Sequence, residues 1–185
     1  MLAPLPGEQV LEPGFGTGHS LEAIAAAVGE EGRVFGIELS PRMLGLAQER
    51  LEREGLALRA ELSLGDAASL PFRDSKVDAV FMSFTLELFD TPEIPRVLGE
   101  CRRVLRPGGR VCVVALSKAG PPRLMERLYE WGHLKWPALL DCRPIYVGHS
   151  LREAAFKVRE SRLSTIWGLP VETVLAFKQE TSKGE

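Results

Sequence analysis

Cysteine, an excess of one charge and long apolar runs are all scarce in this sequence. The 185 residues include only three cysteines, Cys101, Cys112 and Cys142, an odd number without a C-x-x-C pair. This excludes a disulfide framework and a zinc site of the usual spacing, so no metal centre is expected. Free thiols also predict a reducing, cytoplasmic compartment.

Neither sign of charge dominates, because 23 Lys and Arg residues oppose 25 Asp and Glu residues and leave a formal charge of −2. Without an overall positive field, no nucleic acid is expected as a partner. No window reaches the roughly 18 apolar residues of a membrane span, and the first residues lack the features of a signal peptide. Stable membrane insertion is therefore not expected.

What the sequence does contain, over residues 9–116, is an alternation of short aliphatic runs with helical patterns. This alternation is typical of βαβ units and predicts a parallel sheet in an α/β fold. Strands are expected at residues 10–12, 33–39, 58–64, 77–83 and 110–116, with helices after the first, second and fourth. The length fits a single domain over residues 1–185.

Several local signals place helix boundaries and the last elements. Ser40-Pro41 and Thr91-Pro92 each combine a side-chain cap with a proline suited to the first helical turn. Residues 118–149 are rich in aromatic side chains and are interpreted as an insertion that forms a lid over the active site. Ser150 and Glu153 have the spacing of a capping box that opens a short helix, and two final strands follow.

The residues with the most chemical content follow the first predicted strand. Glu12 precedes the turn Gly14-Phe15-Gly16-Thr17-Gly18, which leads into a helix. Glycines there let the backbone take positive φ and approach a ligand, while N–H groups of the helix start face it. Glu38 ends the second strand, where a carboxylate can accept hydrogen bonds from both hydroxyls of a ribose. A nucleoside-containing cofactor is therefore expected.

Spacing and charge distinguish between two classes of cofactor. The nicotinamide dinucleotide fingerprint is G-x-G-x-x-G, whereas this turn has the spacing G-x-G-x-G. Glu12 beside the turn would repel a pyrophosphate but attract the cationic amino group of a sulfonium cofactor. The charges favour S-adenosylmethionine over the oxidoreductase alternative.

Five segments, in order, resemble motifs of class I S-adenosylmethionine-dependent methyltransferases. They are residues 10–18, 36–44, 65–67, 70–78 and 104–110. The similarity spans nearly the whole chain and is greatest to the methyltransferase type 11 group, which includes the ubiquinone and menaquinone methyltransferases. This resemblance implies a Rossmann-like seven-stranded sheet, mostly parallel with an antiparallel last strand, and helices on both faces.

The resemblance also implies how S-adenosylmethionine and its product S-adenosylhomocysteine are held. Glu12 and the glycine turn would bind the methionine end, and Glu38 the ribose. The alternative for these acids is a solvated position at a strand end. All the residues that the resemblance assigns to the cofactor are Glu12, Gly14, Phe15, Gly16, Thr17, Gly18, Glu38, Leu39, Met43, Gly65, Asp66, Ala67, Ser83 and Phe84.

Within that set, Leu39 and Met43 would pack on the adenine faces, and Asp66 would accept a hydrogen bond from its amino group. For Met43 the alternative is plain core packing. Residues 83–89 depart from the Phe-Gly-Leu-Arg-Asn sequence usual in the quinone methyltransferases, so the acceptor is left open. Ala155 also stands where the family commonly has glycine, and a left-handed helix end there would be strained.

Methyl transfer from a sulfonium depends mainly on holding the acceptor close in a dry site, so a catalytic base is optional. His133, Tyr146 and His149 are weak candidates for one, and Glu87 is another. The sequence predicts a methyltransferase that acts on a small, partly apolar acceptor molecule and allows a homo-oligomer. The alternative is a non-catalytic S-adenosylmethionine-binding protein that needs a partner to complete the acceptor site.

Overall fold

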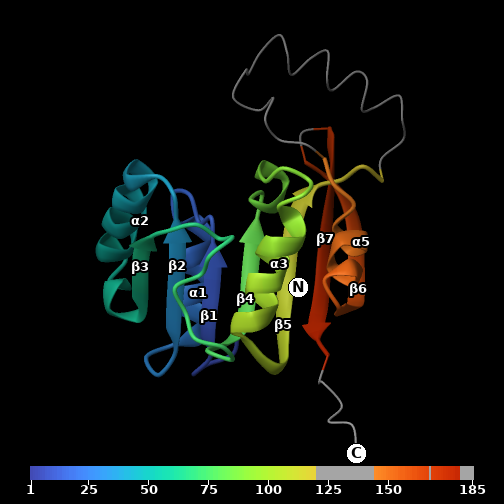
Figure 1. Cartoon of the computed structure of the whole chain (residues 1–185). Helices are drawn as coiled ribbons and strands as arrows, with labels where there is room; N and C mark the ends of the chain where they lie inside the picture. Colours follow the sequence, from blue (N-terminus) through green and yellow to red (C-terminus); the bar gives the residue numbers. More distant parts are fainter. Residues whose placement is uncertain (120–143, 167, 180–185) are drawn as a thin grey trace, which may run out of the picture.

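A sheet of seven strands with helices on both faces forms the centre of the computed structural model, which describes residues 1–119, 144–166 and 168–179 (Figure 1). The strand order is β3-β2-β1-β4-β5-β7-β6. Strands β1 to β5 run parallel, and β7 lies antiparallel to both β5 and β6. The predicted Rossmann-like sheet is confirmed. The strands are β1 (Gln9–Pro13), β2 (Arg33–Glu38), β3 (Ala60–Leu64), β4 (Val77–Ser83), β5 (Leu105–Leu116), β6 (Phe156–Ile166) and β7 (Leu169–Lys178).

The helices follow the predicted apolar patterns. In α1 the apolar residues Leu21, Ile24, Ala25 and Val28 recur with the period of a helix and are all buried, and the helix ends before Gly29, which has a φ of 71°. At the start of α2 the Ser40 hydroxyl accepts a hydrogen bond from the Met43 amide, as the cap predicts. The helices are α1 (His19–Val28), α2 (Pro41–Arg53), α3 (Ile94–Val104) and α5 (Val147–Glu153), with 3₁₀ turns η1 (Ala57–Arg59) and η2 (Leu86–Leu88).

Alternating side chains of the central strands form one core on each face of the sheet. Val10 packs with the buried faces of α1 and α2, whereas Leu11 packs with α3 and α5 on the opposite face. Cys101 and Cys112 are buried free thiols, one in the core on each face of the sheet. The helices therefore cover both faces, and the strand ends are left as the places where a ligand can enter.

The predicted start of the third helix at Thr91-Pro92 is wrong, because α3 begins at Ile94. The carbonyl oxygen of Asp90 accepts hydrogen bonds from the amides of both Glu93 and Ile94. Residues 90–93 therefore form a turn of their own before the helix, and the cap signal falls inside that turn.

The predicted capping box at residues 150–153 is also wrong, since α5 already begins at Val147. The Ser150 hydroxyl donates to the carbonyl of Tyr146 from within the helix instead of capping its start. Val147 and Leu151 are buried, so packing against the sheet extends the helix in the N-terminal direction.

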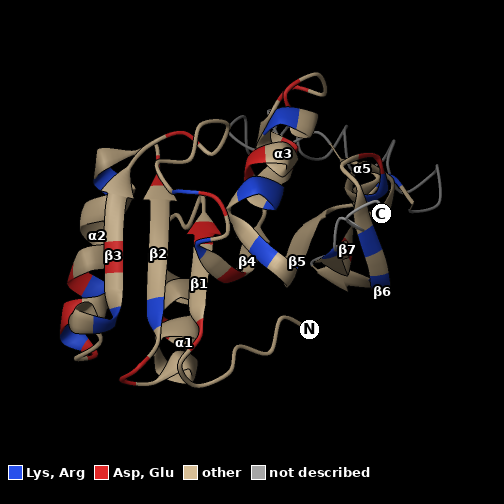
Figure 2. Ribbon diagram, turned by 60° about the horizontal axis from the view of Figure 1, so that its bottom comes forward, with Lys and Arg blue, Asp and Glu red and all other residues tan. Residues whose placement is uncertain are grey.

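The remaining predicted features are the distribution of surface charge, the lack of a membrane span and the lid. Acidic and basic residues are interspersed on α2, as Figure 2 shows. No helix within the described ranges is long and apolar enough to cross a membrane. The predicted lid at residues 118–149 falls mainly on residues 120–143, which lie outside the described part of the chain. The base candidate His133 and the third cysteine, Cys142, belong to that range.

Ala155, directly after α5, has a φ of 59°, so the predicted left-handed helix end is confirmed. This conformation costs a residue with a Cβ atom about 1 to 2 kcal/mol. Glycine avoids this cost but loses more chain entropy on folding, which offsets part of the gain. Ala155→Gly is therefore expected to raise the free energy of unfolding by about 0.5 to 1 kcal/mol in urea denaturation. The matched control is Ala154→Gly, because Ala154 has a φ of −79° and glycine should destabilise the chain there. Equal effects of the two substitutions would contradict the assignment of strain.

Candidate functional site

The carboxyl ends of the parallel strands bring most of the predicted site residues to one edge of the sheet. The backbone links neighbouring ends directly: the Gly14 amide donates to the Ile37 carbonyl at 2.7 Å, and the Gly65 amide donates to the Glu38 carbonyl at 3.0 Å. Ligands of open α/β sheets bind outside this edge. The glycine turn, Glu38 and residues 65–67 therefore surround a common region.

The glycine turn has the predicted left-handed backbone, with φ of 68° at Gly14, 55° at Gly16 and 80° at Gly18. A Cβ atom at Gly14 would lie 2.2 Å from the methyl carbon of Thr85, and one at Gly18 would lie 2.8 Å from Ala47. At Gly16 no atom lies within 4 Å of such a Cβ. The two outer glycines thus allow close packing, while the middle one leaves its space open to a ligand.

Glu12 is a buried acid at the end of β1 and is only 1% exposed. One carboxyl oxygen accepts a hydrogen bond from the Ser20 hydroxyl, and the other has no partner. Burial raises the pKa of Glu12 to about 8. The alternative of a solvated acid is wrong for this residue, whose unpartnered oxygen can receive a cationic or hydrogen-bond-donating group.

Glu38 joins the glycine turn to the start of α2. Its Oε2 accepts a hydrogen bond from the Gly16 amide and its Oε1 accepts one from the Ser40 amide, both at 3.0 Å. Because each carboxylate oxygen has a second lone pair, two further donors can still bind. The geometry suits a pair of neighbouring hydroxyl groups.

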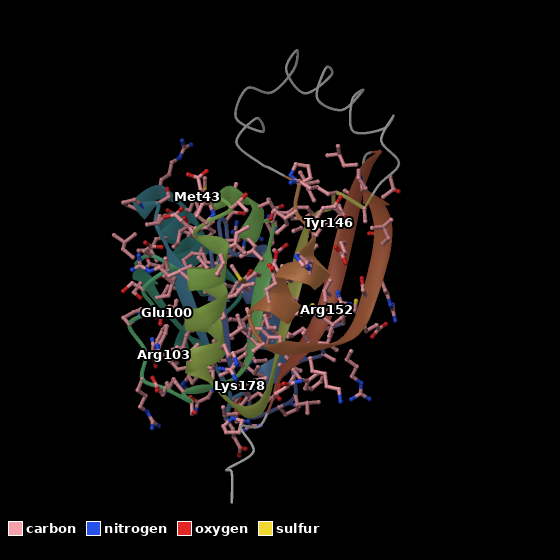
Figure 3. All side chains as sticks on the ribbon, turned by 45° about the vertical axis from the view of Figure 1, so that its right-hand side comes forward. Met43, Glu100, Arg103, Tyr146, Arg152 and Lys178 are labelled. Carbon is pink, nitrogen blue, oxygen red and sulfur yellow. The ribbon has the colours of Figure 1, made fainter. Side chains whose placement is uncertain are left out.

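The residues predicted to surround an adenine lie directly after β2, on α2 and in the turn after β3. Leu39 is 66% exposed, which is unusual for a leucine beside a sheet, and Met43 is half-buried. Asp66 is exposed and accepts a hydrogen bond from the Ala68 amide at 2.8 Å, while Ala67 is buried. Figure 3 shows Met43 at the carboxyl edge, by which we mean the edge of the sheet where the parallel strands end. These residues offer apolar surface next to an acid.

The turn after β4 contacts the glycine turn from the other side. Ser83 ends the strand, and Phe84 takes a φ of 52° with its side chain 40% exposed. The Thr85 hydroxyl donates to the Gly14 carbonyl at 3.0 Å. Sequence reasoning missed Thr85, because its role is a contact with a residue 71 positions earlier and no local pattern signals it.

Among the weak base candidates, the structure distinguishes exposed residues from a buried one. Tyr146 is 53% exposed, and the exposed His149 lies 3.3 Å from the carboxylate of Glu153. Glu87 is buried, its Oε1 accepts a hydrogen bond from the Leu116 amide at 3.2 Å, and its Oε2 has no partner. Burial raises the pKa of Glu87. The described residues contain no group of three or more side chains that could hold a metal ion.

Comparison with known proteins gives concordant matches. A family model described as a methyltransferase domain matches residues 10–109. The 2-phytyl-1,4-naphtoquinone methyltransferase of Synechococcus elongatus is 34% identical over 67% of this chain and 52% of its own length. The demethylmenaquinone methyltransferase of Bacillus cereus is 38% identical over 61% of this chain and 46% of its own. This chain thus spans about half the length of these curated relatives.

Solved structures extend the likeness beyond the matched segment. The crystal structure of a SAM dependent methyltransferase from Aquifex aeolicus is 25% identical, with a TM-score of 0.73 over 95% of this chain and 85% of that one. The common fold therefore includes the antiparallel strands at the C-terminal end of the chain.

Proposed function

This chain belongs to the methyltransferase domain family, and from that premise we propose that it transfers a methyl group from S-adenosylmethionine to a small, partly apolar acceptor molecule, with S-adenosylhomocysteine as the second product. The observation that carries the proposal is the buried, unpartnered oxygen of Glu12. A buried carboxyl group needs a partner, and the amino group of a methionine moiety supplies a cation with N–H donors.

The other strand ends fit the rest of such a cofactor. In this proposal Glu38 accepts the two ribose hydroxyls, and Leu39 and Met43 pack against the adenine. Asp66 accepts a hydrogen bond from the adenine amino group, while Ser83 and Phe84 lie beside the methionine carboxylate and the methyl group. The sulfonium supplies an already activated methyl group, so the chain mainly holds the reactants close and excludes water.

An apolar surface beside the turn after β4 supports the choice of acceptor. Phe84 and Leu88 follow β4 and are 40% and 56% exposed. Tyr146, which directly precedes α5, is 53% exposed and follows Ile145, whose strand partner is Ser117 just after β5. The two quinone-methylating relatives carry names that imply ring-containing, apolar substrates. The lid at residues 118–149, the single-domain organisation, the cytoplasmic location and the homo-oligomer stay predictions.

Calorimetry tests the cofactor assignment. S-adenosylmethionine and S-adenosylhomocysteine are expected to bind saturably, and NAD is not. Binding of NAD without binding of S-adenosylhomocysteine would overturn the proposal. A screen of metabolite extract with an isotopically labelled methyl donor then separates an enzyme from a non-catalytic binding protein, because only the enzyme forms a labelled product.

Glu38→Ala is expected to weaken binding of S-adenosylhomocysteine more than Asp66→Ala does. Removing a charge-assisted hydrogen bond costs about 1.5 to 3 kcal/mol, so the loss at Glu38 should reach about tenfold or more. Asp66 makes one such contact in the proposal and Glu38 makes two. Glu61→Ala, an exposed acid on β3, is the matched control for the lost charge. Unchanged affinity of a folded Glu38→Ala protein would show that the ribose is bound elsewhere.

A further inference from the structure

Glu87 is the second buried acid near the carboxyl edge, and the proposed cofactor site does not use it. The residue lies on η2 directly after β4 and is 1% exposed. Its Oε1 replaces a strand partner by accepting a hydrogen bond from the Leu116 amide near the end of β5. Its Oε2 is buried without a hydrogen-bond partner. A buried oxygen without a hydrogen-bond partner destabilises the folded chain, so its presence calls for a reason beyond folding.

The position of Glu87 places it between the proposed cofactor turn and the segment that leads to α5. Two residues before it, Thr85 contacts Gly14 of the glycine turn. On the other side, the amide of Ile145 donates to the carbonyl of Leu116, whose own amide is bound by Glu87. Figure 3 shows Tyr146, the next residue, at the same edge as Met43. An acceptor at this edge would therefore meet the turn that carries Glu87.

The same turn carries backbone strain and apolar surface. Phe84 has a φ of 52°, a strained conformation for a bulky residue, and residues strained in this way cluster at functional sites. Phe84 and Leu88 flank Glu87 in the sequence and are both exposed. The Leu116 amide uses only one carboxyl oxygen, a contact that a neutral glutamine would make equally well. The strained turn is thus followed directly by a buried carboxyl oxygen that has no hydrogen-bond partner.

We propose, on the basis of the proposed function, that Glu87 is the general base of the reaction and that the acceptor is a phenol or enol. The acceptor hydroxyl donates to Oε2 of Glu87 and gives up its proton there. The electron pair that this releases forms the new bond to the methyl carbon, either at the oxygen or at a conjugated ring carbon. In the second case the methylated ring carbon then loses its own proton to water and the oxygen takes up a proton again, which restores the ring. The bond from that carbon to sulfur breaks with its electrons staying on sulfur, and Glu87 later returns the proton to water.

The chemistry of the site favours this class of acceptor. An ionised carboxylate oxygen accepts hydrogen bonds and donates none, so its partner must carry a hydrogen-bond donor, as a phenol or enol hydroxyl does. Burial raises the pKa of Glu87 toward that of a phenol, which makes proton transfer between them more favourable. The positive charge of a bound sulfonium keeps part of the carboxyl group ionised. Exposed Phe84 and Leu88 suit the flat, apolar ring that such an acceptor carries.

The first test measures binding rather than activity. In the complex with S-adenosylhomocysteine, the wild-type protein is expected to bind 2-naphthol more tightly than 2-methoxynaphthalene, which has no hydroxyl proton. Glu87→Gln keeps the bond to the Leu116 amide but places an N–H donor where Oε2 was. The oxygen atoms of both ligands can accept from this donor, so the preference for 2-naphthol should be lost. Glu93→Gln, an exposed acid just before α3, is the matched control and should keep the wild-type preference. An unchanged preference in Glu87→Gln would overturn the proposal.

The second test measures transfer of a labelled methyl group to naphthols. Glu87→Gln is expected to lower kcat for 2-naphthol about 100-fold, within the usual range for loss of a general base. For a dinitronaphthol, which is already ionised at neutral pH, the same substitution should lower kcat far less. If Glu87→Gln fails to fold, Glu87→Asp replaces it and should keep the preference for the hydroxyl ligand.

The outcomes separate this proposal from the cofactor assignment. Glu87→Gln should bind S-adenosylhomocysteine as tightly as the wild type. A wild-type protein that binds S-adenosylhomocysteine but methylates no phenol or naphthol leaves the cofactor assignment intact and overturns the role of Glu87. Equal loss of activity on ionised and protonated acceptors also overturns it. Failure to bind S-adenosylhomocysteine at all refutes the proposed function itself.

Discussion

Glu12→Gln is expected to bind S-adenosylmethionine about 100-fold or more weakly than the wild type, because breaking a buried ion pair costs about 3 to 5 kcal/mol. The amide keeps the size of the side chain and can still accept from Ser20, so the loss reports the missing negative charge. Calorimetry at neutral pH measures the effect. Glu30→Gln removes an exposed acid beyond α1 and should leave the affinity unchanged. Equal affinities of Glu12→Gln and wild type would place the methionine amino group elsewhere.

Because the pKa of Glu12 is raised, both the stability of the protein and its affinity for the cofactor should depend on pH, and Glu12→Gln should change both dependences. Without ligand the carboxyl group titrates at about 8, well above its ordinary value of 4.5. The folded state therefore holds a proton that the unfolded state has already lost, and stability falls as pH rises from 4.5 to about 8. A bound ammonium group favours the ionised carboxylate, so binding releases the proton of Glu12. The affinity for S-adenosylmethionine should therefore rise with pH up to about 8. Glu12→Gln should flatten both dependences.

Features that depend on a few neighbouring residues could be predicted from the sequence. The stripe of α1 is such a case, since burial repeats with the period of the helix and Gly29 ends it. The glycine turn is another, because only glycine takes the positive φ observed at Gly14 and Gly16 without strain. The seven-stranded sheet with its antiparallel last strand came from the family resemblance, which carries tertiary information that local patterns lack.

Features that depend on contacts between distant segments escaped prediction. The start of α5 is set by burial of Val147 against the sheet, which overrides the local capping box. Glu12 and Glu38 were identified by type and position, but their difference in burial depends on how β1 and β2 are covered. Glu87 was one base candidate among several, because its burial and its contact with the Leu116 amide on β5 join residues that lie far apart in the sequence. Sequence patterns thus identify which residues carry chemistry, whereas packing decides which of them are desolvated.

Gly14→Ala is expected to lower the free energy of unfolding by about 3 kcal/mol or more, since it combines a left-handed φ with overpacking. The new Cβ would lie 2.2 Å from the Thr85 methyl carbon and 2.6 Å from its hydroxyl oxygen, so one of the two turns must move. Because Gly14 lies in the proposed methionine-binding turn, the folded fraction should also bind S-adenosylhomocysteine poorly. Chemical denaturation and calorimetry measure the two losses separately.

Gly55→Ala separates the clash from the backbone strain. Gly55 has a φ of 69°, almost the value at Gly14, but no atom lies within 4 Å of its Cβ position. It should therefore cost only the strain of about 1 to 2 kcal/mol and leave binding intact. Thr85→Ala in the Gly14→Ala background removes the two closest atoms and should restore part of the stability. If Gly14→Ala is as mild as Gly55→Ala, or if Thr85→Ala restores nothing, the turn after β4 does not hold the glycine turn in place. The coupling between the proposed cofactor and acceptor halves of the site would then need another contact.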